Sequence, residues 1–69
     1  METDRWGRRI RAFRKLKRYT QEGFAKELGI SVSVLGEVER GSRLLTEQLL
    51  KKISDRLDVP LEELTPFSH

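Results

Sequence analysis

The groups in this sequence that could do chemistry are mainly cations, and they are concentrated at one end of the chain. Residues 1–18 hold eight basic and two acidic side chains, whereas residues 19–69 hold six basic and nine acidic ones. A basic end on a small chain suggests contact with a polyanion such as a nucleic acid. A solvated helix face would have the same composition, so charge alone leaves both interpretations open.

Other chemistries lack the groups they need. The 69 residues include no cysteine, which excludes disulfides, thiolate zinc sites and cysteine nucleophiles, and fits a reducing cytoplasm. The single histidine is His69, the last residue, where we expect a loose tail rather than a metal or catalytic site. There is no acid–base pair, no phosphate-binding glycine loop and no run of about 18 apolar residues. We therefore expect neither an enzyme nor a membrane protein, and no cofactor or metal.

The positions of the apolar side chains predict helices throughout the chain. Trp6, Ile10 and Phe13 recur at spacings of four and three, which places them on one face of a helix that Thr3 or Asp4 is expected to cap. Another face of the same helix carries a stripe of basic residues, Arg8, Arg11, Lys15 and Arg18. We predict an all-α single domain over residues 1–69, with helices at residues 4–17, 21–28, 32–40, 47–57 and 61–65.

Polar residues and a glycine mark the ends of the central helices. Thr20, Ser31 and Thr46 are expected N-caps, and Gly29 is expected to end the second helix in the left-handed conformation that glycine adopts without strain. Residues 30–34 alternate between apolar and polar, which is also a strand signal. The chain offers no second strand to pair with them, so we favour a helix.

The second and third predicted helices have the spacing of a helix-turn-helix. They span residues 21–28 and 32–40 and are joined by three residues, with the small side chain of Ala25 where two helices must cross closely. The glycine turn and the inward-facing side chains occur in the same register. Together these features indicate a helix-turn-helix more strongly than any one of them does.

The sequence resembles the Cro and lambda-repressor-like DNA-binding domains, also called XRE-type, from about residue 6 to residue 65. The resemblance rests on the segments RRIRAFRKLKRYTQEGFAKELGIS, VERGSR and LLKKISDRLDVPLEEL. It implies a five-helix lambda-repressor-like domain with a central helix-turn-helix. It also implies a bacterial transcriptional regulator that binds double-stranded DNA, in the cytoplasm at the nucleoid.

The third helix has an outward face that matches the base-reading positions of this family. With Leu35 and Val38 inward, the residues expected to face outward are Ser31, Val32, Ser33, Gly36 and Glu37. Ser33 can bond several base edges, Val32 can touch a thymine methyl group, and Glu37 can accept from a cytosine amino group. None of them offers a bidentate contact to guanine or adenine. We therefore expect modest affinity, with much of it from phosphate contacts and DNA shape.

The resemblance also implies roles for charged and polar residues around this face. Phosphate contacts are expected from Gln21, Arg40, Ser42 and Arg43. Arg14 and Glu39 match a partly buried salt bridge between the first and third helices. The negative charge of Glu37 is unfavourable beside DNA unless it is paired, and either Arg40 or Arg43 could pair with it.

Two expectations concern partners. Family members commonly dimerise through the last helix, so a homodimer on an inverted repeat is expected, joined through Leu61, Leu64 and Phe67. Closure of the chain's own core by Leu61 and Leu64 remains an open alternative. A second functional hypothesis is a protein-interaction module with weak or no DNA binding, which would use the surface formed by Val32, Ser33 and Gly36.

Overall fold

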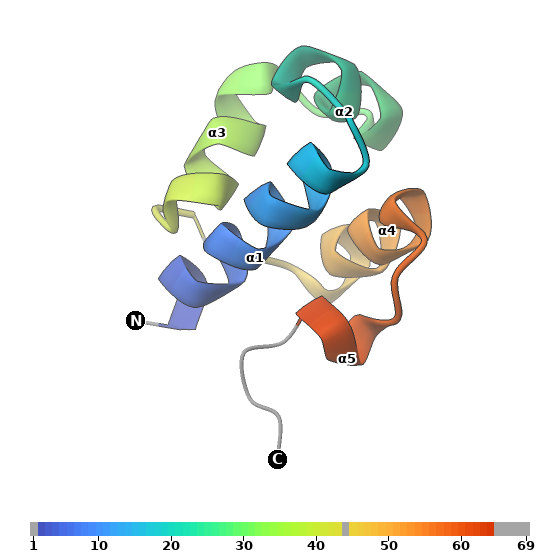
Figure 1. Cartoon of the computed structure of the whole chain (residues 1–69). Coiled ribbons are helices and arrows are strands. Elements are labelled where there is room, and N and C mark those ends of the chain that lie inside the picture. Colours follow the sequence, from blue (N-terminus) through green and yellow to red (C-terminus); the bar gives the residue numbers. More distant parts are fainter. Residues whose placement is uncertain (1, 44, 65–69) are drawn as a thin grey trace.

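A computed structural model of the chain describes residues 2–43 and 45–64. These residues form five helices and no strand, as predicted, and none of these helices is long and apolar enough to cross a membrane. Figure 1 shows α1 at the centre, with α2 and α3 on one side and α4 and α5 on the other. In chain order the helices are α1 (Glu2–Leu16), α2 (Gln21–Leu28), α3 (Val32–Arg40), α4 (Glu47–Leu57) and α5 (Leu61–Leu64).

The first helix is shifted relative to its predicted bounds. It begins at Glu2, so the expected cap at Thr3 or Asp4 is wrong, because both residues lie inside the helix. It ends at Leu16 because Arg18 adopts the left-handed conformation, with φ 67°, and its amide donates to the Lys15 carbonyl. Glycine adopts this conformation without penalty, whereas an arginine there is under backbone strain.

The predicted caps fix the central helices. The side-chain oxygens of Thr20, Ser31 and Thr46 accept hydrogen bonds from backbone amides three residues later, at 2.9, 3.1 and 3.1 Å. Gly29 is left-handed, with φ 72°. Each such cap is worth about 1 kcal/mol of stability. Because Ser31 ends the turn with an extended backbone and starts α3, the strand signal in residues 30–34 is correctly overruled.

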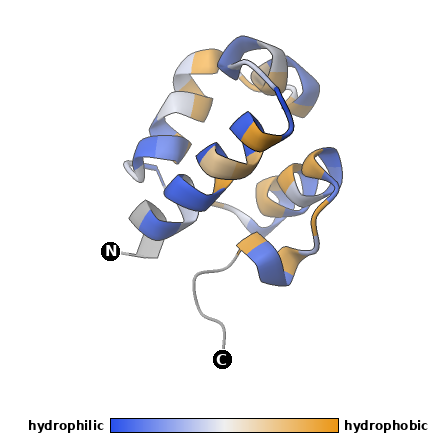
Figure 2. Ribbon diagram, viewed as in Figure 1, coloured by the Kyte–Doolittle hydropathy of each residue, from blue (hydrophilic) through white to orange (hydrophobic). Residues whose placement is uncertain are grey.

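The core lies where the five helices face one another. The ribbon in Figure 2 changes between hydrophobic and hydrophilic colours along the helices, as expected for helices that bury one face. Trp6 and Phe13 are partly buried against this core, so the stripe on α1 packs as predicted. The buried hydrophobic residues are Ile10, Phe24, Ala25, Leu28, Leu35, Val38, Leu50, Ile53, Leu57 and Leu64.

A glycine sets the distance between α1 and α3. Gly7 is buried, and a Cβ added to it would lie 2.6 Å from the carbonyl oxygen of Glu39 and would also collide with that of Val38. A side chain at this position therefore requires the backbones of the two helices to separate. The close approach brings the C-terminal half of α3, which carries part of the candidate site, against α1.

Candidate nucleic-acid interface

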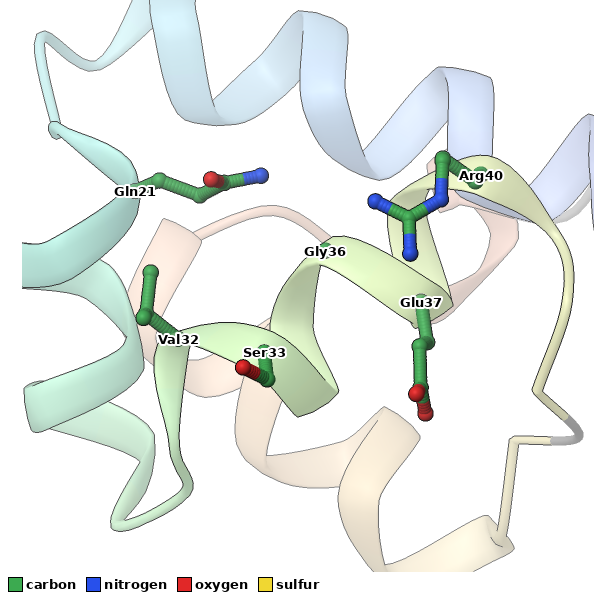
Figure 3. A pocket seen from close by; sticks show the side chains of 6 residues that line it. All are labelled: Gln21, Val32, Ser33, Gly36, Glu37 and Arg40. Carbon is green, nitrogen blue, oxygen red and sulfur yellow. The ribbon is translucent and has the colours of Figure 1, made fainter.

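The helix-turn-helix holds α3 with one face open to solvent. Ile30 donates its backbone amide to the Ala25 carbonyl at 3.0 Å, which closes the turn after α2. Leu35 and Val38 are almost completely buried and fix the inner face of α3. On the outer face, an open hollow lies between α3 and the start of α2 (Figure 3). We call this surface the reading hollow; it is lined by Gln21, Val32, Ser33, Gly36, Glu37 and Arg40.

The predicted base-reading residues do not all lie alike on this face. Val32 is exposed over 39% of its surface, and Ser33 is exposed beside it. Ser31 is exposed as well, but its hydroxyl oxygen accepts a hydrogen bond from the Val34 amide at 3.1 Å and so caps α3. Val32 and Ser33 therefore present side chains to the hollow, whereas Ser31 mainly fixes the helix start.

Gly36 is placed differently from the sequence-based expectation. We expected it to face outward, but it is buried. The reason is Arg40, one turn later, whose Nη1 atom lies 3.2 Å from the position that a Cβ on Gly36 would occupy. Gly36 therefore forms the floor of the reading hollow, and the Arg40 side chain covers it.

Glu37 lies at one edge of the hollow and is paired with Arg43. The Arg43 Nε atom donates to Glu37 Oε1 at 2.7 Å, and the Ser42 hydroxyl donates to the Glu37 carbonyl at 3.3 Å. Of the two partners considered for Glu37, the structure has Arg43. The pair neutralises the acidic group on this face and holds the residues after α3 against the helix.

A buried network joins α1, α2 and α3 behind the hollow. The Arg14 guanidinium donates to both carboxylate oxygens of Glu39, at 2.6 and 3.2 Å, and to the Tyr19 carbonyl at 2.9 Å. Arg14 is only 7% exposed and Glu39 only 5%. Burial makes such a pair costly to break, because the remaining charge has no water around it.

Gln21 connects this network to the surface. Its Nε2 atom donates to Glu39 Oε1 at 3.1 Å, and its side chain also lines the reading hollow (Figure 3). An amide nitrogen has two protons, so one remains for a second acceptor. Gln21 is thus held in position at the first residue of α2, where unsatisfied backbone amides favour an anion.

The basic stripe on α1 lies outside the reading hollow. Arg11, Lys15 and Arg18 are exposed. Arg9 is used internally, since its Nη1 atom donates to the Glu63 carbonyl at 2.9 Å and fastens α5 to α1. The stripe therefore adds positive charge to the molecule without lining the site.

The expected dimer surface is smaller than predicted. Leu64 is fully buried in the chain's own core, so it offers no surface to a partner, and its assignment to the interface is wrong. Leu61 remains exposed over 36% of its surface. Phe67 lies outside the described residues. Within residues 2–43 and 45–64, no group of three or more His, Cys, Asp or Glu residues is arranged to hold a metal ion.

This geometry defines a helix-turn-helix protein, and comparisons with known proteins specify the class. A family model for the helix-turn-helix, HTH_3, matches residues 10–64. The chain is 62% identical over 66 residues to the HTH-type transcriptional regulator YazB of Bacillus subtilis (strain 168), and the match covers 96% of both proteins.

Solved structures of regulators have the same fold. The restriction-modification controller protein C.AhdI from Aeromonas hydrophila is 33% identical, with a TM-score of 0.86 over 91% of both chains. The S. venezulae BldD DNA-binding domain is 30% identical, with a TM-score of 0.84 over 94% of this chain and 97% of that one. The chain therefore belongs to the XRE-type family of helix-turn-helix transcriptional regulators.

Proposed function

We propose that this chain binds specific DNA sequences by placing the outer face of α3 in the major groove. The observation that carries the proposal is the reading hollow, which opens between the exposed N-terminal part of α3 and the start of α2 (Figure 3). In helix-turn-helix proteins the N-terminal residues of the second helix contact base edges while the first helix crosses the backbone. Val32 and Ser33 occupy the corresponding place, and Glu37 lies one turn further along.

Phosphate contacts are assigned to the two sides of the hollow. Gln21 stands at the N-terminus of α2, held by Glu39, and keeps one amide proton for a phosphate oxygen. On the other side, Ser42 and Arg43 follow α3 and are exposed. Two phosphate-binding sides separated by a base-reading helix fit the two strands that border a major groove. The protein would work on the DNA of a bacterial nucleoid, without catalysis.

Assembly as a homodimer completes the proposal. Two α3 helices related by a two-fold axis would contact half-sites about 34–36 Å apart on an inverted repeat. The exposed side chain of Leu61 on α5 supports this surface, and Phe67 is the second residue assigned to it. Sedimentation equilibrium should show association that weakens in Leu61→Asn. A clean monomer at high protein concentration would contradict the dimer.

The alternative hypothesis, a protein-interaction module, draws on the exposed Val32 and on the acidic Glu37 at the edge of the face. The ion pair with Arg43 weakens this alternative, because it removes the net negative charge that would repel DNA. What remains on the hollow is a small polar and apolar surface with the cation Arg40 over it. A surface that carries a cation and no net negative charge suits a nucleic acid.

Selection of bound duplexes from a random pool, at about 50 mM salt, tests the proposed function. The wild-type protein should enrich one inverted-repeat sequence, and fluorescence anisotropy should confirm binding to it. Ser33→Asp should abolish DNA binding, because it places a negative charge in the groove of a polyanion. Lys52→Gln makes the same change in net charge on exposed α4 and should leave most of the affinity intact. Failure of the wild-type protein to bind any duplex at low salt would overturn the proposal and favour the alternative.

A further inference from the structure

Arg40 lies at the C-terminal end of α3, yet its charged group lines the reading hollow over Gly36. Its guanidinium extends back along the helix towards Gly36 and Gln21 (Figure 3). The Nη1 atom lies 3.2 Å from the position of a Cβ on Gly36, and Gln21 Nε2 lies 3.8 Å from that same point. The group is therefore one turn closer to the start of the helix than the Cα atom that carries it.

The direction of the Arg40 side chain follows from helix geometry. Side chains on a helix point towards its N-terminus, so a residue covers the surface of the preceding turn. Four residues earlier the chain has a glycine, which leaves the space that the guanidinium occupies. A long side chain that follows a glycine by four residues can thus reach the part of the recognition helix that normally contacts bases.

The charge of Arg40 is available for a ligand. Among residues 2–43 and 45–64, Arg40 has no hydrogen-bond or ion-pair partner. Its acidic neighbour on α3, Glu37, is held by Arg43, and Gln21 donates to Glu39. The hollow therefore contains a free planar guanidinium with its donors directed over the α3 surface.

We propose that Arg40 contacts a guanine base edge, and not a phosphate as the family resemblance implied. A guanidinium can donate two parallel hydrogen bonds to guanine O6 and N7, which is the commonest specific contact in the major groove. Val32, Ser33 and Glu37 cannot make a bidentate contact of this kind. The inference rests on the proposed function, and it names the residue that supplies most of the sequence preference.

The position of the guanidinium separates this role from a phosphate contact. Gln21 lines the hollow at the start of α2, and Arg43 is paired with Glu37 at the edge of the hollow, where the DNA backbones would pass. Arg40 Nη1 instead lies over Gly36, against the α3 surface that would face the bases. Within the described part of the chain Arg40 also differs from Arg43 in being unpaired, so no contact with those residues must break before it binds.

Arg40→Lys tests the proposal, because it keeps the positive charge and removes the two-pronged donor geometry. In the random-duplex selection, the wild-type protein should enrich a G·C pair at one position of each half-site. Arg40→Lys should lose that preference, with affinity for the selected duplex falling about 5- to 150-fold. Its affinity for unrelated duplexes should stay close to that of wild type. Arg43→Lys is the matched control and should keep the G·C preference.

The outcomes separate this inference from the proposed function. If the wild-type protein selects a sequence and Arg40→Lys selects the same one, only the assignment of Arg40 is overturned. If Arg40→Lys lowered the affinity for all duplexes to the same extent, the assignment would likewise be overturned, and Arg40 would be a phosphate contact. Absence of duplex binding by the wild-type protein would overturn both.

Gly36→Ala provides a second test, because it should raise the stability of the fold and lower the preference for a G·C pair. The new Cβ would meet only the ends of the flexible Arg40 and Gln21 side chains, so the fold should tolerate it. Alanine favours a helix over glycine, and thermal unfolding should show a Tm higher by roughly 4–8 °C. The same substitution fills the space under the Arg40 guanidinium, which must then shift, and should reduce the G·C preference. A more stable protein with an unchanged preference would overturn the role of Gly36 in placing Arg40.

Discussion

Two glutamates of α3 form ion pairs with arginines outside this helix, and the two pairs have almost the same length but very different surroundings. Arg14 and Glu39 are 2.6 Å apart with side chains 8% and 2% exposed, whereas Arg43 and Glu37 are 2.7 Å apart with side chains 48% and 39% exposed. Coulomb attraction at one distance is far weaker in water than in a protein interior, and exposed pairs contribute only about 0–1 kcal/mol. Burial, and not distance, therefore separates a structural pair from one that can exchange partners.

The contacts around each pair support this contrast. Arg14 and Glu39 are bound further by the Tyr19 carbonyl and by Gln21. No buried side-chain nitrogen or oxygen in the described part of the chain lacks a hydrogen-bond partner. Arg43 and Glu37 are open to solvent beside the reading hollow. A phosphate could replace Glu37 as the partner of Arg43 with little loss. The first pair positions α3, and the second is available for binding.

The largest expected effect comes from breaking the buried pair. Arg14→Met should destabilise the fold by about 3–5 kcal/mol, because it leaves the Glu39 carboxylate buried without a partner. Adding Glu39→Gln should recover part of the loss, since the stranded charge is removed. Urea unfolding of both single variants and the double variant measures the coupling. Strictly additive losses would show that the two side chains do not act as a pair.

Next in size is the helix contact that brings Glu39 to Arg14. Gly7→Ala should cost about 1–3 kcal/mol, because the new Cβ collides with the carbonyl oxygens of Val38 and Glu39 and pushes α1 from α3. Gly36→Ala is the matched control and should be stabilising, since its Cβ meets only side-chain ends. Equal changes in the free energy of unfolding of the two variants would mean that helix propensity, and not the close approach of α1 and α3, decides their stability.

The helix caps and the buried ion pair could be predicted from the sequence to a large extent. The caps at Thr20, Ser31 and Thr46 depend on a few neighbouring residues, so the sequence shows them directly. The resemblance implied the Arg14–Glu39 pair. Gly7 lies three and seven residues before Ile10 and Arg14, and this spacing indicates that it belongs to the buried face of α1.

The arrangement of the exposed residues around the reading hollow was less predictable, because it depends on the conformations that long side chains adopt on a surface. The sequence left Arg40 and Arg43 as equal partners for Glu37, and only the path of the Arg40 side chain over Gly36 distinguishes them. For the same reason Gly36 was expected to be exposed. Leu64 was open between core and interface, since a helix of four residues has too few positions for periodicity to decide.

Arg43 tests the exposed pair from its basic side. Arg43→Ala should weaken binding to all duplexes about equally and reduce the slope of log affinity against log salt by about one unit, as expected for one lost phosphate contact. Its free energy of unfolding should change by no more than about 1 kcal/mol. Anisotropy titrations over a range of salt concentrations provide the slope. A loss of preference at one base pair only would assign Arg43 to base contact instead.

The smallest expected effect on stability comes from the acidic side of the same pair. Glu37→Gln should change the free energy of unfolding by less than about 1 kcal/mol, because both side chains of the pair are about half exposed to solvent. DNA affinity should nevertheless rise, since the substitution removes a negative charge from the reading face and releases Arg43 for a phosphate. Preference at one base pair should also change, because Glu37 is the residue that could accept from a cytosine amino group.

Asp55→Asn separates this local effect from net charge, because it removes one negative charge from exposed α4, away from the reading hollow. Affinity should rise more in Glu37→Gln than in Asp55→Asn, and only the former should alter base preference. Equal gains in the two variants would reduce the role of Glu37 to its contribution to overall charge. No change in either affinity or preference, with wild-type binding intact, would place Glu37 outside the interface. The exposed pair would then be as structural as the buried one, only weaker.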